Sequence, residues 1–351
     1  MPDESVLSPA VPAPEPASEE PIFRLPPVVV HPTPSDAEIK AEPWHIAKTR
    51  IVEARDKFAV TGQRVKVAIG DTGFDKVHCE SGQLKSSVAA HHDFTGSGAF
   101  DGHGHGSHVA GLVLSMAPQA KLVNVKCLNN QGAGDDRWIG QSVRKATEEG
   151  CVVFNGSFGS SQPGQYSLAA LKYANENGCI PVIAGGNTGQ SNDVQWPARS
   201  EWVLSVSPLD ENDRVANFGS VGPEIDVAWY GVQMLSLGRN GGFAVMSGSS
   251  MSAPVFAGLL ALRIEWEEAN GGRKTWTVAD AYEWLAKCCR DAGEPGRDPK
   301  FGFGIPDAML AFAAPPIPPL PPPGDLPAIV RDVTINGLPY RETTTYERRG
   351  V

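Results

Sequence analysis

Short apolar runs alternate with segments of helical periodicity through the middle of the chain. The apolar runs are five to seven residues long and lie at 65–70, 122–128, 151–155 and 179–184. Segments with helical periodicity separate them, near 105–114, 137–149 and 165–177. Short continuous apolar runs are typical of strands buried on both faces, and their alternation with helices favours a parallel sheet. The pattern predicts an α/β fold with a mainly parallel central sheet and helices on both faces.

Polar residues follow three of these predicted strands. Asp71, Ser157 and Asn187 each come just past the end of an apolar run. In open sheets of this class, binding sites form at the carboxyl ends of the strands. We therefore expect these three side chains to lie along one edge of the sheet.

Both ends of the chain are rich in proline. Residues 1–43 contain eleven prolines and little apolar periodicity, so we expect them to be extended or disordered. The stretch 315–323 is typical of a polyproline spacer, and Asn336-Gly337 beyond it is a strong signal for a two-residue hairpin turn. The predicted organisation is a Pro-rich acidic extension over 1–43, a globular domain over 44–313, and a Pro-rich linker over 314–351 whose end could form a hairpin.

Composition and charge exclude several classes of protein. Hydrophobic residues make up 41% and charged residues 20%, which is ordinary for a soluble globular protein, and no apolar run approaches the roughly 20 residues that span a bilayer. The net charge of −10 argues against a nucleic-acid partner, and the eight acids and two bases of residues 1–43 carry much of it. The N-terminus shows no secretory signal. A cytoplasmic location is therefore expected, although a virion component or a protein exported by an unconventional route also fits.

The six cysteines lack the spacing of a metal site. Three of them lie in apolar runs, and Cys288 and Cys289 are adjacent, which is poor geometry for a bond to each other. Without a secretory signal, reduced structural thiols are the expectation. We expect no metal ligands among them and no cofactor.

Two glycine-containing motifs place a reactive side chain at the start of a predicted helix. They are His105-Gly106-Ser107-His108-Val109-Ala110-Gly111 and Gly248-Ser249-Ser250-Met251-Ser252-Ala253-Pro254. Together with Asp71-Thr72-Gly73, they supply an acid, a base and a nucleophile in that order along the chain. The same chemistry occurs on unrelated folds in other chain orders, so the order carries information.

A serine hydroxyl becomes a nucleophile when a base lies within hydrogen-bond reach and an acid orients that base. Ser250 is the candidate nucleophile, His105 the base and Asp71 the acid. The oxyanion needs donors, which the Ser250 N–H and the Asn187 amide can supply. Asp71 and Asn187 are weak signals alone, because both residue types are common in glycine-rich turns. The two longer motifs are strong.

Two other hydrolase classes fit less well. Three histidines between 103 and 108 resemble the zinc-ligand spacing of metallo-β-lactamase-like enzymes, with Ser107 in place of the aspartate. The other histidines lie upstream, whereas such an enzyme needs later ligands. The Ser250 motif lacks the last glycine of a G-x-S-x-G elbow, because Ser252 stands there, and esterases with that elbow place the serine first in the chain.

The motifs resemble those of the subtilisin-like serine proteases over about residues 44–313. Asp71 matches the acid in D-[ST]-G, and His105 matches the base in H-G-[ST]-H-V-A-G. Ser250 matches the nucleophile in G-T-S-M-A-x-P with two small-for-small replacements, and Asn187 matches the oxyanion asparagine of A-G-N. The resemblance implies a three-layer subtilisin-like fold. It also implies a serine endopeptidase that cleaves polypeptides through an acyl-enzyme.

The resemblance also assigns a substrate groove. One edge corresponds to Gly132, Ala133 and Gly134, and the opposite edge, with a wall of the P1 pocket, to Ser157, Phe158 and Gly159. An extended peptide would pair between the two edges. Gln195 falls at the base of the P1 pocket and argues against a purely apolar preference, and the Trp196–Pro197 bond is expected to be cis. Asp135 and Asp136 border the groove and either favour basic substrates or form a solvated loop.

The chain departs from the family pattern at two places. Many subtilases carry a calcium-binding insertion in the helix that begins with the catalytic histidine. Here the helical segment leads directly to Ala117-Pro118, so we expect no calcium requirement at that position. Residues 1–43 are also too short and too Pro-rich to form the folded propeptide of secreted subtilases.

Intracellular subtilisins carry instead a short extension that lies across the active site. The apolar segment 22–27 resembles such a plug, and prolines that flank a scissile bond resist cleavage. We hypothesise that the chain's own extension is an autoinhibitory partner; the alternatives are a disordered leader and a tail that docks to other proteins.

A second hypothesis for the whole protein is a catalytically idle subtilase fold used as a binding or assembly module. Its Pro-rich tails would suit docking to aromatic grooves. The presence of all four chemical residues argues against it.

Overall fold

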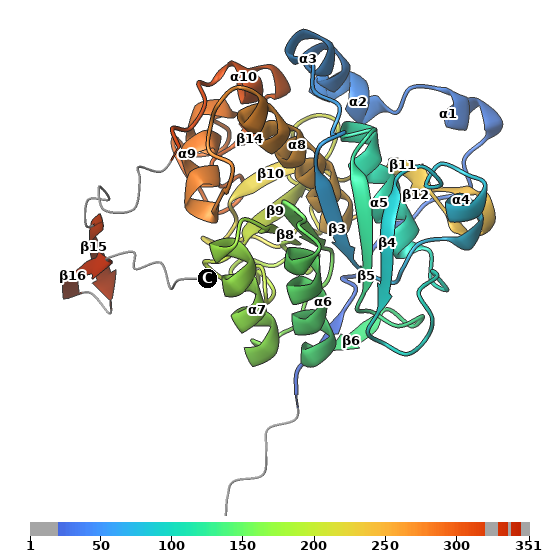
Figure 1. The fold of residues 1–351 in the computed structure, drawn as a ribbon, viewed down its shortest axis with the longest axis horizontal. Helices are drawn as coiled ribbons and strands as arrows, with labels where there is room; N and C mark the ends of the chain where they lie inside the picture. Colours follow the sequence, from blue (N-terminus) through green and yellow to red (C-terminus); the bar gives the residue numbers. More distant parts are fainter. Residues whose placement is uncertain (1–19, 320–328, 336–337, 345–351) are drawn as a thin grey trace, which may run out of the picture.

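The computed structural model describes residues 20–319, together with two strands in the C-terminal segment. A seven-stranded parallel sheet forms the middle layer, in the order β10-β9-β8-β7-β3-β5-β4 (Figure 1). Its strands are β3 (Lys66–Gly70), β4 (Val88–Asp93), β5 (Lys121–Lys126), β7 (Val153–Gly156), β8 (Ile180–Ala184), β9 (Leu204–Leu209) and β10 (Val227–Tyr230). The predicted α/β fold with a mainly parallel central sheet is confirmed.

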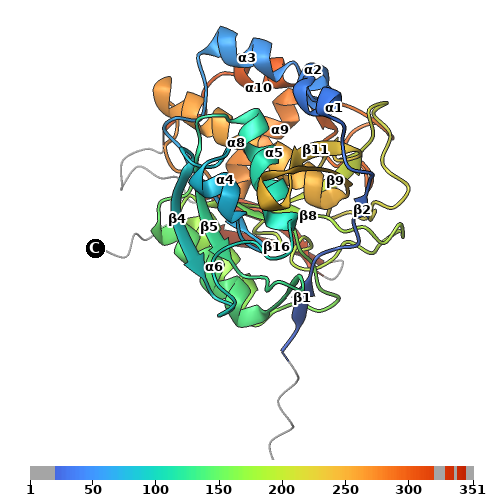
Figure 2. The same cartoon turned by 90° about the vertical axis from the view of Figure 1, so that its right-hand side faces the viewer.

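Helices cover both faces of this sheet (Figures 1 and 2). One face packs against α6 (Asp136–Glu148) and α7 (Gln165–Glu176), and the other against α5 (His105–Met116) and α8 (Ser249–Ala269). Successive strand side chains alternate between the two layers: Val67 and Ile69 join the core on the α5/α8 side, and Ala68 the core on the α6/α7 side. Continuous apolar runs therefore form the central strands, because each strand is buried on both faces.

The remaining elements flank these three layers. The other helices are α1 (Asp36–Lys40), α2 (Trp44–Thr49), α3 (Ile51–Phe58), α4 (Lys76–Glu80), α9 (Val278–Cys288), α10 (Ala308–Ala313) and the short 3-10 helix Arg239–Gly241. Small antiparallel sheets pair β1 (Ile22–Arg24) with β6 (Ala133–Asp135), β11 (Met234–Leu237) and β2 (Val29–Val30) with β12 (Phe243–Ser247), and β13 (Cys289–Arg290) with β14 (Ile305–Pro306).

The strand order changes direction at β3. After β3 the chain builds β4 and β5 on one side, and then crosses to β7 on the other side of β3. A switch of this kind separates the connecting segments and leaves room for a binding site. The turns after β3, β7 and β8 therefore meet along one edge of the sheet.

The described part of the N-terminal extension is more structured than predicted. Residues 20–43 contain β1, β2 and α1, whereas residues 1–19 lie outside the described part. Helix α1 begins after Ser35, whose Oγ accepts a hydrogen bond from the Glu38 N–H at 3.3 Å, and Glu38 accepts in return from the Ser35 N–H at 2.8 Å. This reciprocal cap is a local sequence signal, S-x-x-E, that proline content alone conceals.

The packed domain continues past residue 313. Arg263 and Glu267 are fully buried and pair one turn apart on α8. Arg263 also donates to the carbonyl oxygens of Ala311 at 2.7 Å and Ala314 at 3.0 Å, and Glu267 accepts from the N–H of Ile317 at 3.0 Å. This buried ion pair attaches the first residues of the expected spacer to the domain.

Two strands, β15 (Ile329–Ile335) and β16 (Leu338–Thr344), pair antiparallel beyond the spacer, with Ile335 opposite Leu338. The predicted turn at Asn336-Gly337 lies outside the described residues.

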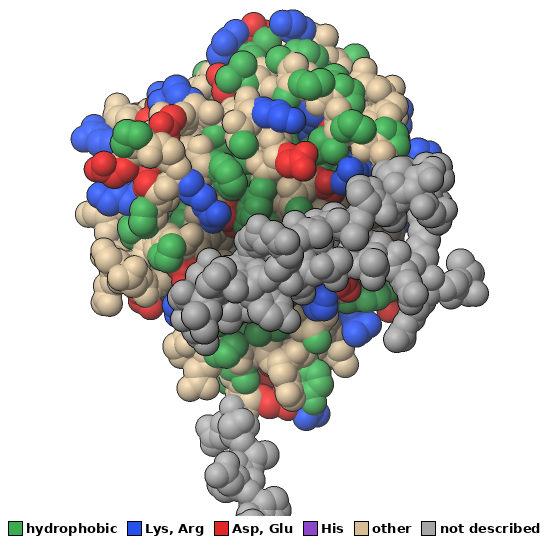
Figure 3. All heavy atoms as spheres, turned by 90° about the vertical axis from the view of Figure 1, so that its left-hand side faces the viewer, with side chains coloured by type: hydrophobic (Ala, Val, Ile, Leu, Met, Phe, Trp, Pro, Cys, Tyr) green, Lys and Arg blue, Asp and Glu red, His purple; other side chains and the backbone are tan. Residues whose placement is uncertain are grey.

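Three further observations concern the charges on the surface, the state of the cysteines and the character of the helices. On the face shown in Figure 3, acidic and basic side chains of the described residues are interspersed rather than gathered by sign. All six cysteines are unpaired, and burial raises the pKa of Cys127 and Cys179, which is typical of structural thiols. Among the helices of the described part, none combines the length and the apolar character needed to cross a bilayer.

We predict that Arg263→Met lowers the free energy of unfolding by about 3–5 kcal/mol, because it leaves the buried Glu267 carboxylate without its positively charged partner. Lys172→Met provides the control, since Lys172 and Glu176 have the same spacing on α7 but are about half exposed. Breaking that exposed pair should cost less than about 1 kcal/mol. Urea denaturation of the two variants measures the difference, and equal losses would contradict the anchoring role of Arg263.

Candidate active site

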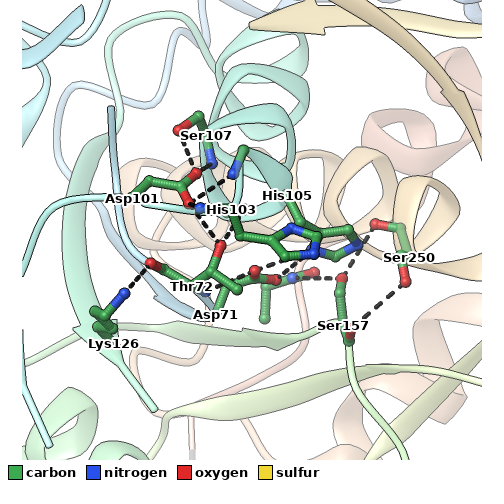
Figure 4. A network of polar contacts seen from close by, with 12 residues as sticks. Asp71, Thr72, Asp101, His103, His105, Ser107, Lys126, Ser157 and Ser250 are labelled. Atoms are coloured by element: carbon green, nitrogen blue, oxygen red, sulfur yellow. Dashed lines mark hydrogen bonds and ion pairs between the residues drawn. The ribbon is translucent and has the colours of Figure 1, made fainter. Parts of the chain in front are cut away.

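The side chains predicted as acid, base and nucleophile converge at the carboxyl edge of the central sheet (Figure 4). Asp71 follows β3, His105 begins α5, and Ser250 lies in the first turn of α8. All three residues are fully buried. His105 Nδ1 lies 2.9 Å from Asp71 Oδ1 and 3.0 Å from Oδ2, so the carboxylate holds that edge of the ring.

Glycine allows the base to approach the acid so closely. A Cβ at Gly106 would lie 2.3 Å from the carbonyl oxygen of Gly73, which no side chain can tolerate. Gly73 itself has φ +105°, in the left-handed region that favours glycine. The first turn of α5 therefore packs directly on the turn that follows β3. The two glycines in the sequence motifs are required by this contact.

Ser250 does not complete the hydrogen-bonded chain in this structure. Its Oγ donates to the carbonyl oxygen of Ser157 at 3.4 Å, and Ser157 Oγ donates to the Ser250 carbonyl at 3.1 Å (Figure 4). Nε2 of His105 has no hydrogen-bond partner within the described residues. The nucleophile thus lies beside the base with its hydroxyl directed to the β7 side of the site.

Asn187 lies on the turn after β8, beside the nucleophile. Its Oδ1 accepts from the Ser249 N–H at 2.8 Å, which fixes the orientation of the amide. Its Nδ2 therefore faces the groove, where it donates to the carbonyl oxygen of Pro27 at 2.8 Å. An amide held in this way is a ready donor for a peptide carbonyl.

The two predicted groove edges face each other, and strand β1 of the extension lies between them. On one side Phe23 pairs antiparallel with Gly134 and Arg24 with Ala133, and the Leu25 N–H donates to the Gly132 carbonyl at 3.1 Å. On the other side Arg24 and Gly159 exchange backbone hydrogen bonds of 2.9 and 2.8 Å. The predicted edges thus hold an extended peptide, and that peptide belongs to the same chain (Figure 2).

Side chains of the extension fill the groove. Phe23 is fully buried and packs edge-on against Phe158, with ring centroids 5.8 Å apart. A Cβ at Gly132 would lie 2.8 Å from Leu25 Cδ1, so this glycine makes room for Leu25. Beyond the site, Val29 and Val30 pair with β12. The extension therefore crosses the whole site, from β6 to β12.

Gln195 lies next to the groove edge formed by residues 157–159, and its place at the base of the P1 pocket stays a prediction. A Cβ at Gly159 would be 2.4 Å from Gln195 Oε1, and a Cβ at Gly186 3.2 Å from Gln195 Cγ. The amide therefore occupies space next to the groove edge. The Trp196–Pro197 bond is cis, as predicted.

The carboxylates of Asp135 and Asp136 each accept hydrogen bonds from backbone N–H groups at the start of a helix. Asp135 accepts from the Trp138 N–H at 2.8 Å and caps α6. Asp136 is fully buried and accepts from the N–H groups of Tyr166 at 2.7 Å and Ser167 at 2.9 Å at the start of α7. The solvated-loop interpretation is wrong for Asp136, and its carboxylate is not available to a basic substrate.

The three histidines between 103 and 108 have different partners: the rings of His103 and His105 lie 6.3 Å apart at their centroids, and His105 contacts Asp71. His108 lies close to the carbonyl oxygens of Met234 and Ala244, at 3.0 and 3.2 Å, and burial lowers its pKa to about 3. Within the described residues, no three His, Cys, Asp or Glu side chains form a group that could hold a metal ion. Helix α5 runs uninterrupted from His105 to Met116. The absence of a calcium requirement at that position stays a prediction.

Sequence reasoning missed two charged residues behind the acid and base. Asp101 is 7% exposed and Lys126 is fully buried. Lys126 stands inside the mainly apolar run 122–128, and a lysine there is a signal, because lysine is rarely buried without a partner. Asp101 gave no comparable signal, since its partners come from several loops.

Comparison with known proteins identifies the family. Residues 62–304 match the subtilase family. Minor extracellular protease Epr of Bacillus subtilis (strain 168) is 28% identical over 283 residues, covering 77% of this chain and 42% of that protein. The thermostable alkaline protease of Halalkalibacterium halodurans is 32% identical over 233 residues, covering 63% of this chain and 62% of that protein. Subtilisin Savinase of Lederbergia lenta is 32% identical over 239 residues, covering 63% of this chain and 83% of that protein.

This chain therefore spans less than two thirds of the length of the first two relatives. The family match covers more than half of the chain and includes Asp71, His105, Asn187 and Ser250. The chain belongs to the subtilase family.

Proposed function

We propose that the protein is a serine endopeptidase that hydrolyses peptide bonds through an acyl-enzyme intermediate. One observation carries the proposal: an extended peptide lies between the two groove edges, with the Pro27 carbonyl oxygen 2.8 Å from Asn187 Nδ2. Ser250 and the Asp71–His105 pair lie beside it. A substrate polypeptide would bind along the same edges.

In the proposed reaction, Ser250 Oγ attacks the substrate carbonyl carbon and its proton passes to Nε2 of His105. Asp71 accepts from the Nδ1–H, which keeps Nε2 available for that proton. Asn187 Nδ2 and the Ser250 N–H stabilise the oxyanion, and the N-terminal end of α8 adds its dipole. His105 then protonates the leaving amine, and water hydrolyses the acyl-enzyme.

The idle-module alternative gains no support from the site. An idle scaffold has no need for a buried acid–base pair, a nucleophile and an oriented amide at one groove. Here the amide of Asn187 is fixed by a backbone hydrogen bond from Ser249, and His105 by two contacts to Asp71. These arrangements favour catalysis.

We further propose that the extension is autoinhibitory and acts as an intramolecular partner of the protease. Strand β1 takes the backbone hydrogen bonds of both groove edges, and Phe23 is fully buried. Pro26-Pro27 lies next to the nucleophile, where two fixed φ angles and two missing N–H groups oppose a productive geometry. The Ser250 hydroxyl is directed to Ser157 instead of His105.

Labelling with a fluorophosphonate tests the proposed activity. We expect the chain to be labelled once its extension is released by deletion of residues 1–43, and Ser250→Ala to abolish that label. Mass spectrometry identifies the modified residue. Absence of Ser250-dependent labelling with the extension removed would favour the idle scaffold.

Release of the extension is expected to raise proteolytic activity. Burial of a Phe side chain contributes about 1.5–3 kcal/mol, so Phe23→Asp should raise kcat/KM by at least about 10-fold, and deletion of residues 1–43 should do the same. Ile22→Asp is the matched control, because Ile22 is on the same strand and 47% exposed. Hydrolysis of a fluorogenic peptide measures the effect. Unchanged kinetics in both Phe23→Asp and the deletion would refute autoinhibition.

A further inference from the structure

A second buried carboxylate, Asp101, lies behind the catalytic acid and base (Figure 4). It accepts hydrogen bonds from the N–H groups of His103 at 2.8 Å, Gly104 at 2.7 Å and Ser107 at 3.0 Å. Its other donors are the hydroxyl groups of Ser107 at 2.5 Å and Thr72 at 2.9 Å. Burial alone would raise the pKa of Asp101, but these hydrogen bonds outweigh it and hold the pKa below the ordinary value.

The donors to Asp101 belong to the two segments that carry the acid and the base of the triad. Thr72 directly follows Asp71, while Gly104 and Ser107 flank His105 at the start of α5. Thr72 Oγ1 also accepts from the Gly106 N–H at 3.0 Å, and the Thr72 N–H donates to Asp71 Oδ1 at 2.7 Å. One carboxylate and one hydroxyl thus join the turn of the acid to the helix of the base.

Lys126 supplies a buried positive charge on the same side. Its Nζ donates to the carbonyl oxygen of Thr72 and, at 2.9 Å, to Oδ1 of Asn130. Burial lowers the pKa of Lys126, and Asp101, Asp93 and Asp71 oppose that shift. The ammonium group therefore compensates Asp71 and Asp101, the two carboxylates that the fold buries on this side.

We propose that Asp101 and Lys126 are positioning residues of the protease: through Thr72 they hold Asp71 and the first turn of α5 in the register that aligns His105. Neither residue is required to touch substrate. The inference rests on the proposed function, because the alignment matters for proton transfer. A displacement of about 1 Å in such a site can lower the rate about 10²-fold.

Matched variants test this in the full-length chain, with and without Phe23→Asp. Asp101→Asn replaces one carboxylate oxygen by an NH₂ group, which would face the N–H and O–H donors that now bind Asp101. Thr72→Val removes the hydroxyl and keeps the shape of the side chain. Thr72→Ser keeps the hydroxyl and is the conservative rescue. Lys126→Met removes the buried charge, and Lys121→Met on the same strand is its control, because Lys121 is exposed.

We expect Asp101→Asn and Thr72→Val to lower kcat about 10²-fold per site titrated with fluorophosphonate, with KM changed less than about 2-fold. Lys126→Met should also lower kcat per titrated site. Thr72→Ser and Lys121→Met should remain within about 3-fold of the native chain. The NMR resonance of the proton between His105 Nδ1 and Asp71 should move in the two impaired variants and stay in place in Thr72→Ser.

If Asp101 and Lys126 only stabilise the fold, a different result is expected. If Tm falls while kcat per titrated site and the Nδ1 proton resonance stay unchanged, the positioning role is refuted. Equal behaviour of Thr72→Ser and Thr72→Val would also overturn it. If the chain shows no Ser250-dependent labelling with its extension released, the proposed function fails, and the Nδ1 resonance, which needs no turnover, still decides whether Asp101 aligns the pair.

Discussion

The close packing of the first turn of α5 on the turn after β3 is the contact on which the site depends. It brings Gly106 against the carbonyl of Gly73 and places His105 Nδ1 2.9 Å from Asp71 Oδ1. The parallel sheet fixes the end of β3, and the glycines remove the side chains that would separate the two segments. Behind this contact, Asp101 and Thr72 connect the same two segments by hydrogen bonds. The acid and the base therefore form one rigid unit, although 34 residues separate them in the chain.

The groove edges are the second constraint. Strand β6 and residues 157–159 present backbone donors and acceptors at a surface, and such edges bind an extended chain whenever one is available. In this structure β1 of the extension binds both edges and buries Phe23 against Phe158. The same geometry explains how a subtilase groove would take a substrate and how the chain's own N-terminal segment would compete with it. Affinity for the extension follows from proximity, since an intramolecular segment is present at high effective concentration.

The sequence allowed the central strands and the composition of the site to be predicted for identifiable reasons. Continuous apolar runs marked β3, β5, β7 and β8, because these strands are buried on both faces. Edge strand β4 escaped notice, because its residues alternate between partly buried and exposed positions and include two adjacent histidines. The motifs and their order along the chain identified Asp71, His105 and Ser250 before any interatomic distance was known. Of the Asp101–Lys126 network, only the lysine inside a predicted strand gave a signal, because the contacts of the network form only after segments distant in sequence have folded together. The attachment of Ile317 to Glu267 was hidden for the same reason.

The proposed mechanism depends most on Asn187 as an oxyanion donor: a backbone hydrogen bond from Ser249 fixes its amide, and its Nδ2 donates to a peptide carbonyl in the groove. Steady-state kinetics of Asn187→Ala, measured on a peptide substrate after release of the extension, tests it most directly. We expect kcat to fall about 10²–10³-fold, the loss typical of removing one oxyanion donor in a protease of this family, with little change in KM. A native kcat in this variant, or a loss confined to KM, would contradict the account.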